Sequence, residues 1–598
     1  MLQALLNQED FEQGIPYERL KQEAGTTMAV LHGLEEKEIV SVTEERQYRN
    51  PVMRAGERDQ QPVLNDQQRR IVDTVTGDYR QGIRKTYLIH GVTGSGKTEV
   101  YMGIIEKVIA EHKQVIVLIP EIALTFQTVS RFYRRFGERV SVMHSRLSQG
   151  EKFDQFERAK AGEIDIMIGP RSALFTPFEH LGLIVIDEEH ETSYQSEMPP
   201  KYHAREVAVH RASMVGASVI LGSATPSLES YYRAQKGRYT LFTLTKRAGG
   251  ASLPKVWVTD LREELERKNR SIFGGKLMEL MQDRLAKKEQ IILFLNRRGY
   301  AGSVSCRKCG EVIKCPHCSV SMTAHMHYGR LEHLVCHYCG YQATMPALCP
   351  KCRSRYIGTF GIGTQKVEQL VSERFPQARV LRMDADTTTG KEGHEKILRD
   401  FAAGSADILI GTQMIVKGHD FPNVTLVGIL AADLSLNVGD FRAAERTYQL
   451  LAQAAGRAGR GEKPGDVVLQ TYQPEHYSIV SAAKQDYLGF YEQELIQRQI
   501  LHYPPVSNIL GVLVLSEQRG HAQELADRLA EQMRRYEQVV ILGPAPASLS
   551  KAKDVYRYVI YAKCADYRIL RQIKNGLEQY MKAQETYRDC RLQFDFNL

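Results

Sequence analysis

The stretch YLIHGVTGSGKTEVY, residues 87–101, decides the fold. An apolar run beginning at Tyr87 leads into residues 91–98, which match the GxxxxGK[ST] pattern of a P-loop. Such a loop joins a buried strand to a helix, and its glycines let backbone N–H groups turn toward phosphate. Lys97 is predicted to reach the β- and γ-phosphates of ATP, and Thr98 to ligate Mg²⁺. A glycine-rich turn without a ligand is the alternative, and it leaves the flanking strand and helix unexplained. The predicted nucleotide-binding residues of the loop are Gly91, Thr93, Gly94, Ser95, Gly96, Lys97 and Thr98.

An acidic partner for this loop stands in GLIVIDEEHETSY, residues 182–194. Residues 183–186 read as a buried parallel strand, with Asp187 and Glu188 at its carboxyl end. We expect Asp187 to hold Mg²⁺ together with Thr98, and Glu188 to orient or deprotonate the attacking water. A solvated acidic turn is the alternative, and the upstream P-loop argues against it.

A second α/β unit is predicted downstream. It begins at QIILFLNRRGY, residues 290–300, and closes with QAAGRAGR, residues 453–460. Gln453, Arg457 and Arg460 are three to four residues apart, which predicts one face of a helix. From there Gln453 would contact ATP, and the two arginines would act as arginine fingers at the transition state. A solvated basic helix face is the alternative. Two lobes with ATP between them would open and close with the nucleotide.

The motifs GSGKT, DEEH, GSAT and QAAGRAGR, in this order, resemble those of superfamily-2 helicases. Longer phrases resemble the primosomal replication-restart helicases, the PriA family, along almost the whole chain. These phrases include PEIALTFQ (120–127), GPRSALFTPF (169–178), DEEHETSYQS (187–196), KYHAREVA (201–208) and KGHDFPNVTLV (417–427).

The resemblance implies an ATP- and Mg²⁺-dependent DNA helicase that moves 3′ to 5′ on single strands. It would act at stalled replication forks and help to reload the replicative helicase. The implied partners are forked and single-stranded DNA, primosome loading proteins, the replicative helicase and the single-stranded DNA-binding protein, with the chain acting as a monomer. Two rival readings stay open: a motor that tracks duplex without unwinding or acts on RNA, and a zinc-bearing assembly scaffold whose ATPase only changes its shape.

Further site residues follow from the resemblance. Gln68 would contact adenine, with a plain polar residue at a helix start as the alternative. Arg171 and Ser172 would grip strand phosphates without reading sequence. An aromatic-rich loop would couple DNA binding to ATP hydrolysis, and its alternative is a lid packed onto the core. Arg297 and Arg298 would contact phosphate, or else lie in a solvated turn. The coupling residues predicted in the loop are Tyr194, Tyr202, His203 and Arg205.

Eight of the ten cysteines lie within residues 306–352 as four Cys-x-x-Cys pairs. A redox pair does not explain four copies, whereas tetrahedral Zn²⁺ takes four thiolates, so two closed structural sites are expected. Seventeen residues separate Cys318 from Cys336, within the usual zinc-ribbon spacing. This assigns an inner site to Cys315, Cys318, Cys336 and Cys339, and an outer site to Cys306, Cys309, Cys349 and Cys352.

The segment that holds these cysteines is expected to bury little apolar surface and to fold only around metal. Inserted after the first strand of the second lobe, it would stand as a rigid knob that helps to part strands and docks partners.

The 598 residues are too many for one core, and the formal charge of +8 permits a nucleic-acid partner. We predict an α/β protein with a winged helix (1–50), helicase lobe 1 (51–245), lobe 2 (246–305 and 354–476), a zinc insertion (306–353), and a helical segment with a ferredoxin-like domain (477–598). The family's preceding 3′-end-binding module is expected to be absent. With no signal peptide or membrane-spanning run, a cytoplasmic protein without membrane contact is expected.

Overall fold

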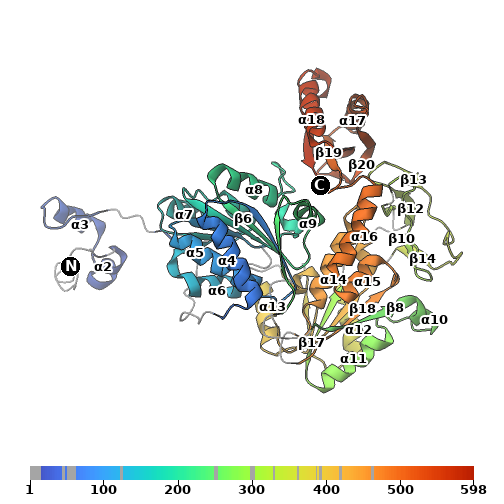
Figure 1. The fold of residues 1–598 in the computed structure, drawn as a ribbon, viewed down its shortest axis with the longest axis horizontal. Helices are drawn as coiled ribbons and strands as arrows, with labels where there is room; N and C mark the ends of the chain where they lie inside the picture. The colour runs from blue at the N-terminus through green and yellow to red at the C-terminus, as the bar shows by residue number, and fades with distance from the viewer. Residues whose placement is uncertain are drawn as a thin grey trace.

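The computed structural model describes residues 15, 17–43, 48–49, 62–120, 126–247, 253–295, 304–318, 320–327, 330–359, 363–384, 387–388, 393–416, 421–459 and 463–597. Two α/β lobes lie side by side, with the C-terminal domain above their junction (Figure 1). None of the described helices is both long and apolar enough to cross a membrane.

Lobe 1 is built on a seven-stranded parallel sheet in the order β3-β4-β2-β5-β6-β1-β7. Its central strands are fully buried on both faces, as their unbroken apolar sequences predict. Because all strands run parallel, their carboxyl ends meet at one edge, where ligands bind open α/β sheets. The strands are β1 (Thr86–Gly91), β2 (Gln114–Leu118), β3 (Val140–Val142), β4 (Ile166–Gly169), β5 (Leu181–Asp187), β6 (Ser218–Ser223) and β7 (Thr240–Leu244), and the helices are α4 (Asp66–Arg80), α5 (Lys97–Ala110), α6 (Phe126–Phe136), α7 (Gln149–Lys160), α8 (Ala204–Val215) and α9 (Leu228–Gln235).

Lobe 2 has a six-stranded parallel sheet in the order β15-β16-β9-β17-β18-β8. Strand β8 (Lys255–Asp260) forms one edge of the sheet. The strand before the zinc insertion, β9 (Gln290–Leu295), is therefore the second strand of this lobe in chain order, whereas the sequence predicts that it is the first. The other strands are β15 (Val380–Met383), β16 (Ile408–Gly411), β17 (Val424–Leu430) and β18 (Asp466–Thr471), and the helices are α10 (Leu261–Glu266), α11 (Gly275–Ala286), α12 (Thr364–Arg374), α13 (Gly393–Ala402) and α14 (Ala443–Ala455).

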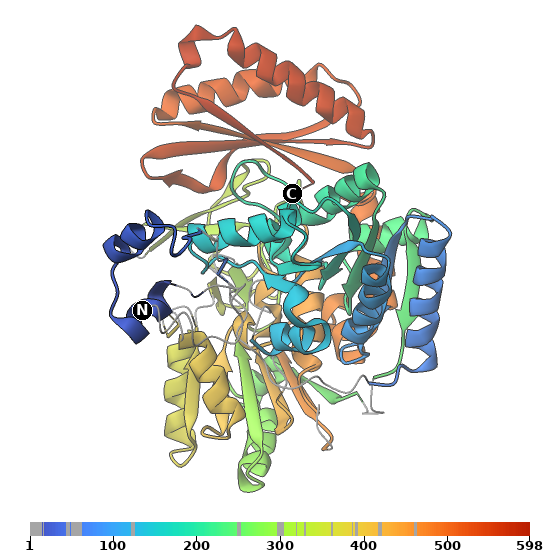
Figure 2. The ribbon, with the colours of Figure 1, turned by 90° about the vertical axis from the view of Figure 1, so that its left-hand side faces the viewer.

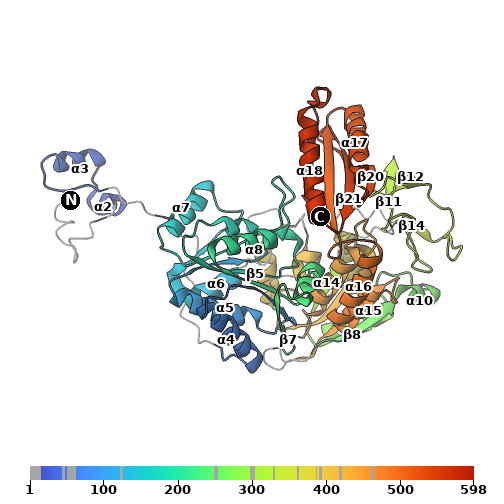
Figure 3. The same ribbon diagram turned by 45° about the horizontal axis from the view of Figure 1, so that its top comes forward.

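Two small sheets form the insertion between β9 and α12. Strands β10 (Val304–Cys306) and β14 (Ile357–Thr359) pair antiparallel at its base. Strands β11 (Thr323–His327), β12 (Arg330–Val335) and β13 (Gln342–Ala343) form a second antiparallel sheet. The insertion lies beside the C-terminal domain (Figure 3).

Two helices, α15 (Tyr477–Lys484) and α16 (Tyr487–Ile500), lead from lobe 2 to the C-terminal domain. That domain runs β19 (Asn508–Ser516), α17 (Arg519–Arg534), β20 (Val540–Ala552), β21 (Val555–Cys564), α18 (Tyr567–Lys582) and β22 (Arg591–Phe596). Its antiparallel strands are ordered β20-β21-β19-β22, the arrangement of a ferredoxin-like sandwich. Both helices cover the face turned away from the lobes (Figure 2).

At the N-terminal end, α2 (Tyr17–Ala24) and α3 (Met28–Glu35) are the two helices expected of a winged helix. Residues 36–43 contain no strand. The wing, and with it the winged-helix assignment of residues 1–50, stays a prediction.

Candidate active site and zinc sites

The P-loop runs from β1 into α5 at the carboxyl edge of the lobe 1 sheet. Gly94 and Gly96 adopt φ of 80° and 78°, a conformation that side chains disfavour and that this tight loop requires. Lys97 is largely buried, and its Nζ donates to the Gly91 carbonyl at 2.9 Å. The ammonium is therefore already held inside the loop that would wrap a phosphate.

Asp187 and Glu188 end β5 beside this loop. Tyr101, from the P-loop helix, donates its hydroxyl to Asp187 Oδ1 at 3.2 Å, which joins the two motifs. Burial, reinforced by the Glu188 carboxylate and opposed by Lys97, raises the pKa of Asp187 to about 6. A metal dication would offset that burial, and the Asp187 carboxylate with the Thr98 hydroxyl offers the oxygen donors that Mg²⁺ prefers. The Glu188 Oε2 atom is buried, lies 3.7 Å from His190 Nδ1, and accepts no hydrogen bond from the described part of the chain.

The second glutamate of DEEH has a structural role. Glu189 accepts hydrogen bonds from the Ser227 backbone N–H at 2.6 Å and from the Ser230 hydroxyl at 2.8 Å, and it pairs with Arg205 at 3.2 Å. All of these groups are buried. Arg205, predicted to touch DNA or couple to it, is thus directed into the core between α8 and α9. In this position it can couple segments of lobe 1, but its guanidinium is not presented to a strand.

The histidine of DEEH joins the two lobes. His190 Nδ1 lies 2.7 Å from the Ser223 hydroxyl at the end of β6, and Nε2 lies 2.7 Å from Gln453 Nε2 on α14. Since the Gln453 amide nitrogen can only donate, Nε2 accepts and Nδ1 carries the proton. Neither His190 nor Ser223 was predicted from the sequence, although both belong to quoted motifs. Gln453 is predicted to bind ATP, and in the structure its amide contacts His190, the last residue of the DEEH motif.

The helix expected to carry both arginines is shorter than predicted. Helix α14 ends at Ala455 with Gly456 as its cap, so Arg457 lies in the following turn and not on the helical face of Gln453. The turn places Gly456 against the P-loop, because a Cβ added there would lie 3.0 Å from the Thr93 side chain. Arg460 lies outside the described residues. The arginine-finger roles of both residues stay predictions.

Replacing Gln453 with alanine is expected to reduce DNA-stimulated ATP hydrolysis by about tenfold while leaving ATP binding nearly unchanged. The amide joins the lobes through His190, and loss of one such hydrogen bond in a buried network costs about 1–2 kcal/mol. Turnover at saturating ATP and binding of a fluorescent nucleotide would be measured together. Gln369, an exposed glutamine on α12 whose amide donates to Glu373, provides the control; an equal loss in Gln369→Ala would contradict this assignment.

Both polar atoms of the Gln68 side-chain amide form hydrogen bonds. Its Oε1 accepts from the Asn65 backbone N–H at 2.9 Å in a capping box, and its Nε2 donates to the Ser95 carbonyl in the P-loop at 2.9 Å. Both the helix-start role and a direct contact with the nucleotide loop are thus present. The adenine contact stays a prediction.

Residues 193–203 form a loop, here called the aromatic loop, that is fixed to the sheet edge. Tyr194 is 1% exposed, and its hydroxyl donates to the Asp187 and Leu118 carbonyls at 2.7 and 3.0 Å. Its ring is therefore not available to a base, and the alternative of a segment packed onto the core describes this residue. Arg171 donates to the Ser193 and Gln195 carbonyls at 2.9 and 2.8 Å, so its guanidinium also holds this loop.

The exposed part of the aromatic loop keeps the residues suited to stacking. Tyr202 is half-buried and packs edge-on against Phe175, a half-exposed ring that the sequence did not single out, at 5.5 Å. His203 caps α8 by accepting from the Arg205 backbone N–H. Ser172 is exposed beside Arg171. Arg297 and Arg298 lie outside the described residues, so their phosphate contacts stay predictions.

The eight clustered cysteines form the two predicted sets. Within each set the four sulfur atoms lie within 4.8 Å of one another, with Cys306–Cys352, Cys309–Cys349 and Cys315–Cys339 Sγ separations of 3.6, 3.6 and 3.5 Å. Four thiolates about 2.3 Å from a tetrahedral Zn²⁺ stand about 3.8 Å apart, so the donor sets fit that ion. Gly310 and Gly340 follow the second cysteine of their pairs with φ of 74° and 80°, which closes each turn around its site.

The inner zinc site lies in a core shared with other parts of the chain. Tyr338 stacks on Tyr561 of the C-terminal domain at 4.8 Å, and His337 Nδ1 lies 3.0 Å from the Pro546 carbonyl. Inner-site cysteines, Tyr503 and Ile509 belong to one buried apolar cluster, against which Phe441 of lobe 2 packs. The expectation of an insertion that buries little apolar surface is therefore wrong, because surface from three neighbouring segments completes its core.

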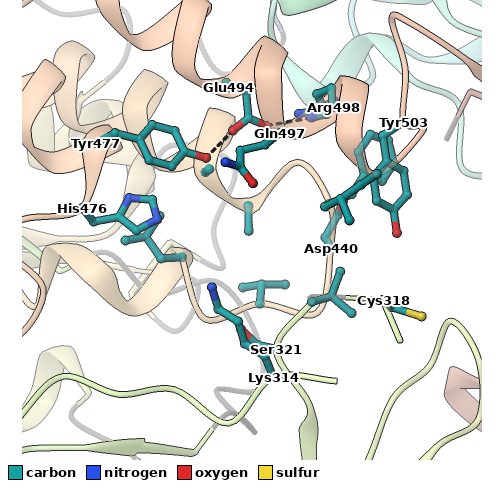
Figure 4. Close-up of a pocket in the computed structure, with 17 residues that line it drawn as sticks. Lys314, Cys318, Ser321, Asp440, His476, Tyr477, Glu494, Gln497, Arg498 and Tyr503 are labelled. Atoms are coloured by element: carbon teal, nitrogen blue, oxygen red, sulfur yellow. Dashed lines mark hydrogen bonds and ion pairs between the residues drawn. The ribbon is translucent and has the colours of Figure 1, made fainter. Parts of the chain in front are cut away.

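The outer zinc site faces lobe 2. Gly310 lies so close to Tyr472, just after β18, that an added Cβ would be 2.2 Å from the Tyr472 carbonyl. Next to Cys318 of the inner site, a cavity of about 170 Å³ separates the insertion from α16 and the segment before α14 (Figure 4). Lys314 points into it from the insertion, while Glu494 across the cavity is engaged by Tyr477 and Arg498. The insertion thus contacts lobe 2 near the outer site, and both lobe 2 and the C-terminal domain near the inner site.

Comparison with known proteins decides the family. Residues 65–234 match the DEAD/DEAH box helicase family and residues 355–462 the helicase conserved C-terminal domain. Residues 315–343 match the Cys-rich region of the PriA DNA helicase, and residues 499–597 the primosomal protein N C-terminal domain. The replication restart protein PriA of Bacillus subtilis (strain 168) is 46% identical over 586 residues, 98% of this chain and 72% of that protein. The chain belongs to the PriA family of replication restart helicases.

Other relatives match this chain over only part of their own length. PriA of Synechocystis sp. is 43% identical, with 90% of this chain and 65% of that protein covered. Among solved structures, the DUF1998 helicase MrfA bound to DNA matches with a TM-score of 0.43 and 16% identity over 72% of this chain and 48% of that one. Membership in the PriA family makes the chain an ATP-dependent superfamily-2 helicase with two zinc-binding sites of four cysteines each.

Proposed function

We propose that this PriA-family chain moves 3′ to 5′ along single-stranded DNA, opens duplex at stalled replication forks, and helps to load the replicative helicase. One observation supports the motor above all: residues of lobe 2 reach the nucleotide motifs of lobe 1. Gln453 contacts His190, and Gly456 lies against Thr93 of the P-loop. A change in ATP would therefore alter how the lobes sit together, which is how a helicase converts hydrolysis into movement.

Hydrolysis would use the residues gathered at the sheet edge. Mg²⁺, when bound, would neutralise charge on the β- and γ-phosphates. Asp187 and Thr98 would hold that ion, and Lys97 would contact the same phosphates. Glu188 would accept the proton of the attacking water through Oε2, the atom left without a hydrogen bond among the described residues. Arg457 and Arg460 would approach from lobe 2 to stabilise charge that develops in the transition state.

The strand is proposed to cross the carboxyl edge of lobe 1. Ser172 is exposed there next to Arg171, and the Phe175–Tyr202 pair offers faces on which bases can stack whatever their sequence. Partner proteins are proposed on family membership alone: primosome loading proteins, the replicative helicase and the single-stranded DNA-binding protein. Action as a monomer is part of the same proposal.

Three substrates test the direction of movement: duplexes with only a 3′ tail, only a 5′ tail, or both arms of a fork. We expect unwinding of the 3′-tailed duplex and the fork at least tenfold faster than of the 5′-tailed duplex. ATP hydrolysis would be followed in the same reactions at fixed salt, because phosphate contacts weaken steeply with salt. Equal rates on both tails would exclude the proposed polarity.

Competitors separate the rival functions in the same assay. Unlabelled single-stranded DNA should suppress unwinding at lower concentration than RNA of the same sequence. ATP hydrolysis stimulated by DNA without strand separation would indicate a translocase, and partner binding without DNA-stimulated hydrolysis would indicate a scaffold.

A further inference from the structure

The end of strand β22 and the residue after it contact both lobes. Asp595 pairs with Lys201 at 3.0 Å and accepts a hydrogen bond from Gln195 at 3.3 Å, and both partners belong to the aromatic loop of lobe 1. Two residues later, the Asn597 carbonyl accepts from Arg442 at 3.0 Å, at the start of α14 in lobe 2. The Lys201 and Asp595 side chains are 18% and 11% exposed, so solvent screens the pair little.

These contacts constrain the lobes through a very short piece of chain. Residues two apart in a strand are about 7 Å apart, and a hydrogen bond is lost once its atoms separate beyond about 3.5 Å. Asn597 is itself fixed to β19, since its N–H donates to the Ile509 carbonyl and its Oδ1 accepts from the Ile509 N–H. A shift of one lobe against the other by a few ångströms would therefore stretch the contact at Asp595 or the one at Asn597.

Both contacts lead directly to the nucleotide site. Gln195 follows Tyr194, whose hydroxyl donates to the Asp187 carbonyl at 2.7 Å, and Arg171 holds the Gln195 carbonyl from the other side. Arg442 of lobe 2 also pairs with Glu229 of α9 in lobe 1 at 2.9 Å, and it immediately precedes α14, the helix that carries Gln453. The C-terminal strand thus touches the segments that follow Asp187 in one lobe and precede Gln453 in the other.

We propose that the end of β22 senses the relative position of the lobes, and that Asp595 is a positioning residue that holds the aromatic loop in the arrangement through which DNA stimulates ATP hydrolysis. This inference rests on the proposed DNA-driven motor. It assigns the C-terminal domain a part in the ATPase cycle of this chain, through a carboxylate that belongs to neither lobe.

The test compares Asp595→Asn, which keeps the hydrogen-bond acceptor but removes the charge, with Lys201→Ala. Each should lower the maximal DNA stimulation of ATP hydrolysis about fivefold, the lower end of usual coupling between sites. Hydrolysis without DNA, the KM for ATP and the affinity for single-stranded DNA should change less than twofold. This split between stimulation and binding is what a merely structural contact would not produce.

Two controls sharpen the result. Asp554 pairs with Lys551 at 2.9 Å in the β20–β21 hairpin, so Asp554→Asn removes a comparable charge in the same domain and should leave stimulation intact. The exchanged pair, Asp595→Lys with Lys201→Asp, should recover at least half of the lost stimulation. Thermal unfolding of each variant would show whether the domain stays folded.

The outcomes are distinguishable. Wild-type stimulation retained in both Asp595→Asn and Lys201→Ala would overturn this inference and leave the motor untouched. Equal loss of basal and stimulated hydrolysis would also overturn it, because it would show a structural role alone. If the wild-type chain itself showed no DNA stimulation, the proposed function would fail first.

Discussion

Replacing Lys97 with alanine is expected to abolish ATP hydrolysis and strand separation together, with a loss of about a thousandfold or more. The ammonium is buried in the P-loop and already hydrogen-bonded to the Gly91 carbonyl, so it is preorganised for the β- and γ-phosphates. Electrostatic stabilisation of developing phosphate charge is worth about 4 kcal/mol when one such group is removed. Single-turnover hydrolysis and fork unwinding, measured in one reaction, give both quantities.

Lys107 provides the matched control for Lys97. It stands on the same helix, α5, but is exposed and lies away from the loop. Lys107→Ala should hydrolyse ATP and unwind at wild-type rates, and the Lys97→Ala chain should unfold at nearly the wild-type temperature. Unwinding that persisted in Lys97→Ala would show that strand separation is not driven by this nucleotide site, and would favour a passive scaffold.

Replacing Cys336 with serine is expected to remove one zinc ion and to release the C-terminal domain. Cys336 belongs to the inner site, and the next two residues, His337 and Tyr338, contact Pro546 and Tyr561 of that domain. Because metal binding supplies most of the folding free energy of such a site, loss of one thiolate should unfold this turn. We expect cleavage between α16 and β19 by a protease to accelerate about tenfold, with zinc content falling from two ions to one.

The outer site separates this effect from a general loss of folding. Cys352→Ser should also cost one zinc ion, but its site packs against lobe 2 near Tyr472, whereas the described contacts with Pro546 and Tyr561 of the C-terminal domain come from residues beside the inner site. The linker should then stay protected. Equal release of the domain by Cys336→Ser and Cys352→Ser would contradict separate roles for the two sites, since it would mean that the insertion folds as one unit.

Much of the fold could be predicted from short sequence patterns. The P-loop is recognisable because its spacing, strand and helix are contiguous, and the buried strand before Asp187 is apolar without interruption. The nesting of the zinc sites follows from counting residues between Cys318 and Cys336. The C-terminal domain follows from the chain order of strands and helices, and its sheet has the expected arrangement.

What the sequence did not predict depends on contacts between distant segments. Tyr194 looks like any exposed loop tyrosine until its hydroxyl is seen bonded to two strand carbonyls. His190 could be found only with its partner Gln453 on the other lobe. The early end of α14 did have a signal, because Gly456 is a common stop residue for a helix. The burial of the zinc insertion needed three neighbouring segments that are far apart in the chain.

The position of β22 also bears on how this protein is made. A chain emerging from the ribosome can fold each lobe as it appears, since each has its own parallel sheet. Strand β19, however, lacks its neighbour β22 until residues 591–596 are synthesised, and until then it presents an unpaired apolar edge to other nascent chains. The contacts that tie both lobes to the C-terminal domain at Asp595 and Asn597 can form only after this strand has been made. A premature stop before residue 591 would leave two folded lobes and an aggregation-prone remainder.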